Sequence, residues 1–291
     1  MKPIGFDDKL AHSIKLLRKG ESMALRFYPK GYYLAFSGGK DSQALYHLAK
    51  MADVKFEAHY AITTLDPPEL VRFIRTNYPD VICDRPDLTF WKLCIKKRAL
   101  PTMNMRFCCA VLKETKGAGT VTLTGVRQKE SSRRAKRKEA ETVTSRQHNK
   151  FSGTYEQLDQ FTRTKENEGI SCVNGKDKIV INPLIEWTEA DVWYFLDNVI
   201  KVPHCKLYDQ GWTRLGCLFC PMASKKDIIR QSKLYPKYKK ALLRTIHQLR
   251  LNGYMQNYKE LTDEEVYQWW ISKQSIRIWY FNNKIQQKLE L

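Results

Sequence analysis

The amino-acid sequence predicts an α/β fold, with a parallel sheet between helices and a further helical region at the C-terminal end. The first observation is an apolar run, residues 32–36, that stops at a Ser-Gly-Gly turn and is followed by apolar residues at helical spacing from Asp41 onward. The second is a repeat of that order, with a strand pattern over 56–62, a polar turn over 63–69 and a helix over 69–78. Repeated strand, turn and helix imply parallel strands with right-handed crossovers, so we expect a Rossmann-like sheet with helices on both faces.

Shorter patterns supply the other expected elements. A helix over 7–19 precedes the first strand, and Thr188 followed by Asp191 resembles a capping box that starts another helix. Further strands are expected at 81–83, at 121–124 and from 179, with a helix at 88–97. From residue 224 to the end the pattern is helical and basic, and most of its aromatic side chains are expected to pack in a core.

Composition limits the classes of protein. The length of 291 residues suits one large domain with appendages, and 43% hydrophobic residues favour a folded core over disorder. The sequence has no apolar run of about eighteen residues and no signal-peptide pattern, so we expect a cytoplasmic protein without membrane contact. Lys and Arg (50) exceed Asp and Glu (31), which gives a net charge of +19 and favours polyanionic partners.

The turn after the first strand predicts an anion-binding loop, Ser37 to Ser42. Gly38 and Gly39 allow close approach of a ligand to the backbone, and the N-terminus of the following helix adds a partial positive charge. Lys40 supplies a cation, and the hydroxyls of Ser37 and Ser42 can bond phosphate oxygens. The sequence matches neither the Walker P-loop nor the dinucleotide pattern G-x-G-x-x-G, so a different kind of nucleotide loop is indicated.

Other residues are expected at the same edge of the sheet. In open parallel sheets ligands bind beyond the carboxyl ends of the strands, where Thr64 and Glu69 follow the second strand. Gly125 and Arg127 follow a later strand, and a guanidinium there can bind a phosphate or sulfate group. The basic segment 127–138 could contact nucleic acid, although a solvated loop explains it equally well. Residues 131–178 are expected to form a basic, partly flexible insertion.

Four cysteines form a candidate metal site. A tandem pair, Cys108 and Cys109, and a C-x-x-C, Cys217 and Cys220, can hold a [4Fe–4S] cluster or a zinc ion. Adjacent ligands and the proline after Cys220 favour the cluster, with zinc or unligated thiols as alternatives.

The other cysteines lack partners at ligand spacing. Cys83 and Cys94 are expected to be buried packing residues, and Cys172 and Cys205 are left unassigned.

Several motifs occur in one order along the chain. They are Ser37 to Ser42, Thr64 with Pro68-Glu69, Cys108-Cys109, 125–127 with Glu130-Ser131, 183–193 and 207–217. As a set they resemble the phosphoadenosine phosphosulfate (PAPS) reductase family in its wide sense, within the PP-loop ATP-pyrophosphatases of the adenine-nucleotide alpha-hydrolase superfamily. The resemblance covers about residues 30 to 225. We therefore expect a nucleotide-binding domain over 1–225 and a helical extension over 226–291.

The resemblance implies ATP as the nucleotide and Mg²⁺ as its counter-ion. Lys40, Asp41 and Arg127 would act in catalysis, and the nucleotide would be bound by Ser37 to Ser42 with Thr64, Glu69, Gly125 and Arg127. Adenylylsulfate reductases in the family hold a [4Fe–4S] cluster with a tandem cysteine pair and a C-x-x-C, which implies ligation by Cys108, Cys109, Cys217 and Cys220.

Two departures separate this sequence from those reductases. It has no cysteine after Cys220, where they carry a catalytic cysteine, and it keeps the Lys40-Asp41-Ser42 form of the loop seen in members that split ATP. The expected activity is ATP-dependent adenylation of an acceptor for sulfur transfer, with nucleic acid as a candidate acceptor and a protein as sulfur donor or reductant. The alternatives are a PAPS or adenylylsulfate reductase and a non-catalytic module that binds nucleotides or nucleic acid.

Overall fold

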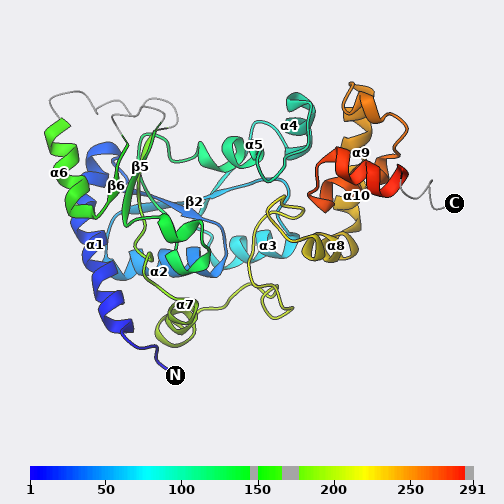
Figure 1. The fold of residues 1–291 in the computed structure, drawn as a ribbon. Coiled ribbons are helices and arrows are strands. Elements are labelled where there is room, and N and C mark those ends of the chain that lie inside the picture. The colour runs from blue at the N-terminus through cyan, green and yellow to red at the C-terminus, as the bar shows by residue number, and fades with distance from the viewer. Residues whose placement is uncertain (145–149, 166–176, 286–291) are drawn as a thin grey trace. The chain divides into compact units, whose positions relative to one another are not determined.

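The computed structural model describes residues 1–144, 150–165 and 177–285 (Figure 1). The chain forms two compact units, each built from several stretches of sequence. The first unit comprises residues 1–62, 68–85 and 114–216, and the second comprises 63–67, 86–113 and 217–291. These units differ from the limits expected from the sequence, 1–225 and 226–291, because segments near residues 65 and 100 belong with the C-terminal helices.

A sheet forms the centre of the first unit. Among the described residues it has seven strands in the order β3-β2-β1-β4-β7-β5-β6. They are β1 (Tyr32–Phe36), β2 (Phe56–Ala61), β3 (Ile82–Asp84), β4 (Val121–Leu123), β5 (Ala140–Val143), β6 (Ser152–Gly153) and β7 (Lys178–Ile181). Strands β1 to β4 and β7 pair in parallel, whereas β5 is antiparallel to β6 and β7. The predicted α/β class with a mostly parallel sheet is confirmed.

Two helices cover side chains of β1, α1 (Phe6–Phe27) and α2 (Lys40–Ala52), and a third, α3 (Pro68–Asn77), follows β2. The hydroxyl of Tyr32 donates to the carbonyl of Leu17 in α1 at 2.8 Å, and the Phe36 ring lies against Tyr46 of α2. Both β1 side chains are buried, so the apolar run that predicts this strand also forms the centre of the core.

Strands β2 and β3 lie on one side of β1, and β4 and the later strands lie on the other side. In doubly wound sheets such a switch point leaves a crevice beyond the carboxyl ends of the two diverging strands. The loop after β1 and the loop after β4 both begin at this point, so the fold places residues 37–39 beside residues 124–127.

Part of the segment 131–178 is regular structure. It contains β5 and β6, and α6 (Tyr155–Lys165) follows β6 and reaches α1 through the Tyr155 hydroxyl, which donates to the carbonyl of Lys19 at 3.1 Å. Strand β5 pairs with β7, and α6 contacts α1, and the polar composition of these elements does not reveal either contact. Residues 145–149 and 166–176 of the expected insertion lie outside the described residues.

Helix α7 (Glu189–Tyr194) begins at the predicted capping box. The Thr188 hydroxyl accepts the Asp191 N–H at 3.1 Å, and the Asp191 carboxylate accepts the Thr188 N–H at 2.7 Å. Lys9 of α1 also bonds Asp191 at 2.7 Å. The start of α7 is therefore fixed, and a π-helical turn, η6 (Phe195–Ile200), continues it.

The second unit is helical. Its helices are α4 (Phe90–Lys97), α5 (Phe107–Cys109), α8 (Lys225–Leu234), α9 (Pro236–Leu251), α10 (Asp263–Ser272) and α11 (Ile276–Tyr280). Short 3₁₀ or π-helical turns join or extend them at η1 (Ala110–Glu114), η7 (Gln256–Tyr258) and η8 (Phe281–Ile285), and the first unit has two more, η2 (Gln128–Glu130) and η3 (Arg134–Lys136). Trp270 is buried and donates its indole N–H to the carbonyl of Pro101 at 2.7 Å, so this aromatic residue is a packing residue, as expected.

In the part of the chain that the structure describes, none of the helices combines the length and apolar character needed to cross a membrane.

Candidate functional site

The loop between β1 and α2 depends on a glycine at its second position. Gly38 has φ +71°, and a Cβ there would lie 2.7 Å from Cγ1 of Ile74 and 2.8 Å from Cδ1 of Leu70, both in α3. Gly39 has ordinary dihedral angles, and its nearest neighbour would be the Tyr208 hydroxyl at 3.4 Å. Only the first of the two glycines is therefore required for the shape of the loop.

The two serines of the loop bond each other. The Ser42 hydroxyl accepts the N–H of Ser37 at 3.1 Å and donates to the carbonyl of Gly39 at 2.9 Å. The hydroxyls of Ser37 and Ser42 are 3.2 Å apart. These bonds hold the turn closed on the first turn of α2, which keeps the positive end of the helix beside the loop.

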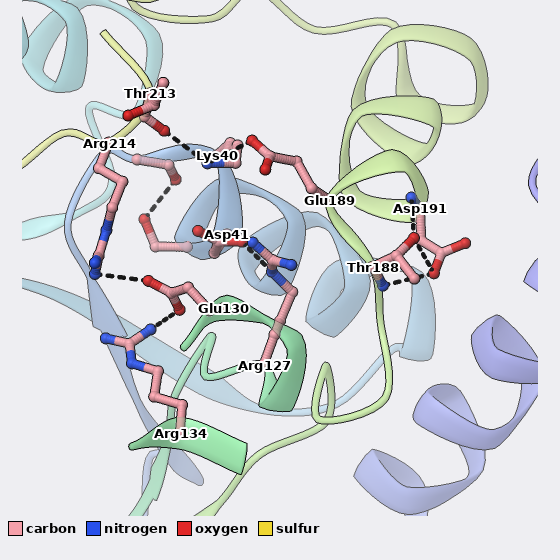
Figure 2. A network of polar contacts seen from close by, with 12 residues as sticks. Lys40, Asp41, Arg127, Glu130, Arg134, Thr188, Glu189, Asp191, Thr213 and Arg214 are labelled. Carbon is pink, nitrogen blue, oxygen red and sulfur yellow. Dashed lines mark hydrogen bonds and ion pairs between the residues drawn. The ribbon is translucent and has the colours of Figure 1, made fainter. Parts of the chain in front are cut away.

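Lys40, the first residue of α2, is a buried cation. Its side chain is 4% exposed, and the ammonium donates to the carbonyl of Thr213 at 3.0 Å and pairs with the Glu189 carboxylate at 3.2 Å. Its main-chain N–H donates to the Tyr208 hydroxyl at 2.8 Å, and burial raises the pKa of that hydroxyl. Figure 2 shows Lys40 between Thr213 and Glu189, which come from different segments.

Asp41 and Arg127 join the loops after β1 and β4. The Arg127 Nε lies 2.6 Å from Oδ1 of Asp41, and the Arg127 side chain is only 3% exposed (Figure 2). Gly125 permits this approach, because a Cβ there would be 2.9 Å from the carbonyl oxygen of Asp41. The structure therefore brings together Asp41, Gly125 and Arg127, which the sequence predicts to share one edge of the sheet.

A second ion-pair group lies beside the first. Glu130 pairs with Arg134 and, at 2.6 Å, with Arg214 (Figure 2). Burial lowers the pKa of Arg134, and the neighbouring Arg214 adds to that effect. The Glu130 side chain is 9% exposed, so it neutralises part of a positive cluster in a weakly solvated position.

The basic segment 127–138 is only partly available to a polyanion. Three of its arginines are engaged, since Arg127 pairs with Asp41, Arg134 with Glu130 and Arg137 with Glu141. The exposed basic residues of the segment are Lys129, Arg133, Lys136 and Lys138.

The four candidate metal-binding cysteines lie in the second unit and line one pocket. Cys108 and Cys109 come from α5, and Cys217 and Cys220 from the segment before α8. The remaining lining residues are Thr63, Leu65, Phe90, Leu112, Lys113, Phe219 and Pro221. Within the described residues, no three His, Cys, Asp or Glu side chains are arranged around the position of a single metal ion.

Polar groups also reach this pocket. The Cys217 thiol donates to the Thr63 hydroxyl at 3.3 Å, and that hydroxyl donates to the buried Asp66 carboxylate at 2.8 Å. The pKa of Lys113 is raised: burial lowers it, but attraction to Cys217 and Asp66 outweighs burial. Hydrogen bonding to Cys109, followed by burial, raises the pKa of Cys108.

Two predicted ligand residues after β2 fall in different units. Thr64 belongs to the second unit, where its hydroxyl accepts the N–H of Phe90 at 2.9 Å, and Glu69 lies half-buried in the first turn of α3 in the first unit. Their shared role at a nucleotide site stays a prediction.

The remaining cysteines behave as follows. Cys94 is buried as predicted, and burial raises its pKa to about 12. Cys83, predicted to be buried, is exposed, because β3 is the edge strand of the sheet. Cys205 is 1% exposed. Cys172 lies outside the described residues.

Sequence reasoning did not assign roles to Tyr208, Thr213, Glu189 or Glu130, although all four lie in the motifs that carry the family resemblance. Their contacts join segments up to 173 residues apart, so only the motif set could have indicated them.

The mostly parallel sheet and the Ser-Gly-Gly-Lys-Asp-Ser loop at its switch point define an α/β protein with a candidate nucleotide-binding loop. A family model described as the phosphoadenosine phosphosulfate reductase domain matches residues 31–223, and the chain belongs to this family.

Individual relatives and solved structures share less than 30% sequence identity with this chain over most of its length. An uncharacterized protein of Methanocaldococcus jannaschii is 28% identical over 241 residues, which cover 77% of this chain and 51% of that protein. The chain thus spans about half the length of this relative. The structure of a PAPS reductase from Candida auris, a phosphate complex, has a TM-score of 0.46 at 16% identity and covers 76% of this chain and 97% of that one. A U34-tRNA thiolase from Methanococcus maripaludis with its [4Fe–4S] cluster has a TM-score of 0.42 at 12% identity, covering 88% and 81%.

Proposed function

We propose that the protein binds ATP through residues 37–42 and transfers the adenylyl group to an acceptor, releasing pyrophosphate as the first half of a sulfur-transfer reaction. The observation that carries this proposal is the buried Lys40 at the N-terminus of α2, directly after a glycine turn at the switch point of the sheet. A buried cation, main-chain N–H groups and a helix N-terminus form a site that favours several phosphate oxygens together.

The loop residues act on the leaving group. An acceptor oxygen attacks the α-phosphorus, the bond from that phosphorus to the bridging oxygen breaks, and pyrophosphate leaves with the electron pair. Lys40 and the first N–H groups of α2 would neutralise the charge that develops on it. Arg127 would hold Asp41 in position through the 2.6 Å contact, so that its carboxylate faces the phosphates and can bind the Mg²⁺ that accompanies ATP.

The second half of the reaction, the transfer of sulfur, would take place at the cysteine pocket. Four sulfur donors around one pocket fit a [4Fe–4S] cluster by donor chemistry, and Cys108, Cys109, Cys217 and Cys220 are the residues that would hold it. When bound, such a cluster supplies a site for sulfur or electrons. The protein's own contribution is a positive group, Lys113, and the Thr63–Asp66 hydrogen bond beside the Cys217 sulfur.

The test of adenylation measures ATP binding by calorimetry, and pyrophosphate–ATP exchange in the presence of Mg²⁺ and a nucleic acid as acceptor. Lys40→Met is expected to weaken ATP binding by about tenfold or more, because it removes the buried cation. Lys50→Met is the matched control, since Lys50 lies at the far end of the same helix with a 53% exposed side chain. Equal ATP affinity in wild type and Lys40→Met would contradict the proposed role of the loop.

Family membership supports one other activity, the reduction of a sulfonucleotide. Anaerobically purified protein with adenylylsulfate or PAPS and a dithiol reductant distinguishes the two. Sulfite production without pyrophosphate–ATP exchange would identify a reductase and exclude the adenylation proposal.

A further inference from the structure

The Lys40 ammonium already has an anionic partner from its own chain. The Glu189 carboxylate lies 3.2 Å from it, and the two residues are 4% and 59% exposed in their side chains. One member of this ion pair is therefore fixed in the protein interior, and the other is largely exposed. Figure 2 shows the Glu189 side chain pointing from the start of α7 toward Lys40.

Glu189 is not needed to build the helix that carries it. It is the first residue of α7, but the capping box is formed by Thr188 and Asp191, and Lys9 holds Asp191 from α1. The main chain at Glu189 is therefore fixed, while its side chain can leave Lys40 without breaking the cap.

The main-chain N–H of Lys40 also bonds an oxygen of the protein. Its N–H, the first of α2, donates to the Tyr208 hydroxyl at 2.8 Å. Protein oxygens from two other segments thus bond both donor groups of Lys40 that the proposed function assigns to phosphate oxygens. A phosphate that binds Lys40 at the position of the Glu189 carboxylate competes with it.

We propose that Glu189 is an autoinhibitory counter-ion of the loop, which competes with phosphate for Lys40; this inference rests on the proposed nucleotide-binding function. Displacing Glu189 costs the same free energy for every anion, whereas attraction to Lys40 and the helix N-terminus grows with the charge of the anion. Glu189 therefore lowers the affinity of the loop for every anion by the same factor, and pyrophosphate or the triphosphate of a nucleotide, which the site attracts most strongly, keeps the affinity needed to bind. It also favours release of pyrophosphate after the reaction, because the carboxylate can return to Lys40.

The direction in which a Glu189 substitution changes the affinity for phosphate distinguishes a competitor from a residue that contacts the ligand. Removing a ligand contact weakens binding, and so does local damage to the site. Removing a competitor strengthens binding. Because Glu189 is largely exposed, we expect its pair with Lys40 to resemble a surface ion pair, and Glu189→Gln to lower the Kd for pyrophosphate by roughly two- to fivefold.

The experiment is a calorimetric titration of the full chain with inorganic pyrophosphate and, separately, with inorganic phosphate. It uses wild type, Glu189→Gln and a control, Glu186→Gln, which removes the same charge from an exposed residue on the segment before α7. Glu186→Gln is expected to change the Kd by less than about 1.5-fold, since a charge exposed to water is screened.

A second experiment tests whether Glu189 changes the pyrophosphate affinity through its contact with Lys40. In a Lys40→Met background, Glu189→Gln is expected to have no effect on pyrophosphate affinity, because the two side chains act through one contact. Unchanged or weaker pyrophosphate binding in Glu189→Gln, or a gain equal to that of Glu186→Gln, overturns the inference alone. Failure of both wild type and Glu189→Gln to bind pyrophosphate or ATP overturns the proposed function as well.

Discussion

Alanine at either of the two adjacent glycines of the loop is expected to destabilise the protein, but by clearly different amounts. Gly38→Ala places a Cβ 2.7 Å from Cγ1 of Ile74 and 2.8 Å from Cδ1 of both Ile74 and Leu70, at a residue with φ +71°. Gly39→Ala adds the same methyl group at φ −80°, where the nearest atom is 3.4 Å away. The pair separates the conformational role of glycine from its small size.

The magnitude follows from two costs. A side chain in the left-handed region costs about 1–2 kcal/mol, and forcing a methyl into a packed contact costs about 1–3 kcal/mol, so Gly38→Ala is expected to lower the free energy of unfolding by about 3 kcal/mol. Gly39 is the N-cap of α2, where alanine is a poorer residue than glycine, and its substitution is expected to cost about 0.5–1 kcal/mol.

The assay is urea unfolding followed by circular dichroism, together with hydrogen exchange of the α2 and α3 amides. Truncating Ile74 to alanine in the Gly38→Ala protein is expected to recover about 1 kcal/mol relative to the sum of the single changes, because it removes part of the overlap. A Gly38→Ala protein as stable as Gly39→Ala would refute the reasoning, and so would purely additive effects with Ile74→Ala.

The remaining predictions concern the ion pair, the cysteines and pH. Asp41→Asn is expected to cost about 2 kcal/mol in urea unfolding, because it leaves the buried Arg127 guanidinium without its carboxylate; a double variant with Arg127→Met that is no more stable than Asp41→Asn would contradict this. Cys217→Ser is expected to remove most iron and sulfide from anaerobically purified protein, and the buried Cys205→Ser to keep them; a zinc-containing, colourless wild type would rule out the cluster. Burial, followed by the charge of a neighbouring lysine, lowers the pKa of His47 to about 4, so between pH 6.5 and 4 the unfolded chain binds a proton that the folded chain does not. Stability therefore falls on acidification, by about 2–3 kcal/mol at pH 4, and His47→Gln is expected to reduce that loss; an unchanged pH profile would exclude His47 as its source.

Local sequence patterns predict the elements that form the loop. The apolar run at β1, the glycine turn and the Thr188–Asp191 capping box depend on residues within about one helical turn of each other, and the structure confirms all three. The strand order and the position of the switch point follow from general rules for parallel sheets, so the meeting of Asp41 and Arg127 at one edge is also predictable.

Contacts between distant segments were not predictable in this way. The sequence of strand β5 alone is typical of a polar loop, and its pairing with β7 and β6 makes it a strand. The prediction that Cys83 is buried is wrong, because an apolar pattern does not distinguish an edge strand from a central strand. The partners of Lys40, which are Tyr208, Thr213 and Glu189, come from well over a hundred residues away, and no local pattern specifies them.

The path of the chain between the two units has a consequence for folding. The boundaries fall at 62/63, 67/68, 85/86, 113/114 and 216/217, so the second unit is assembled from three stretches and cannot be cut out as one continuous piece. Cys109 and Cys217 lie before and after residues 114–216, the last segment of the first unit, which contains β4, β5, β7 and α7. Any group bound to both sulfurs would close a loop of about a hundred residues, and such a cross-link raises the free energy of the unfolded chain by about 5 kcal/mol. Filling the cysteine pocket would therefore stabilise the folded state of the segment that carries β4, β5, β7 and Arg127.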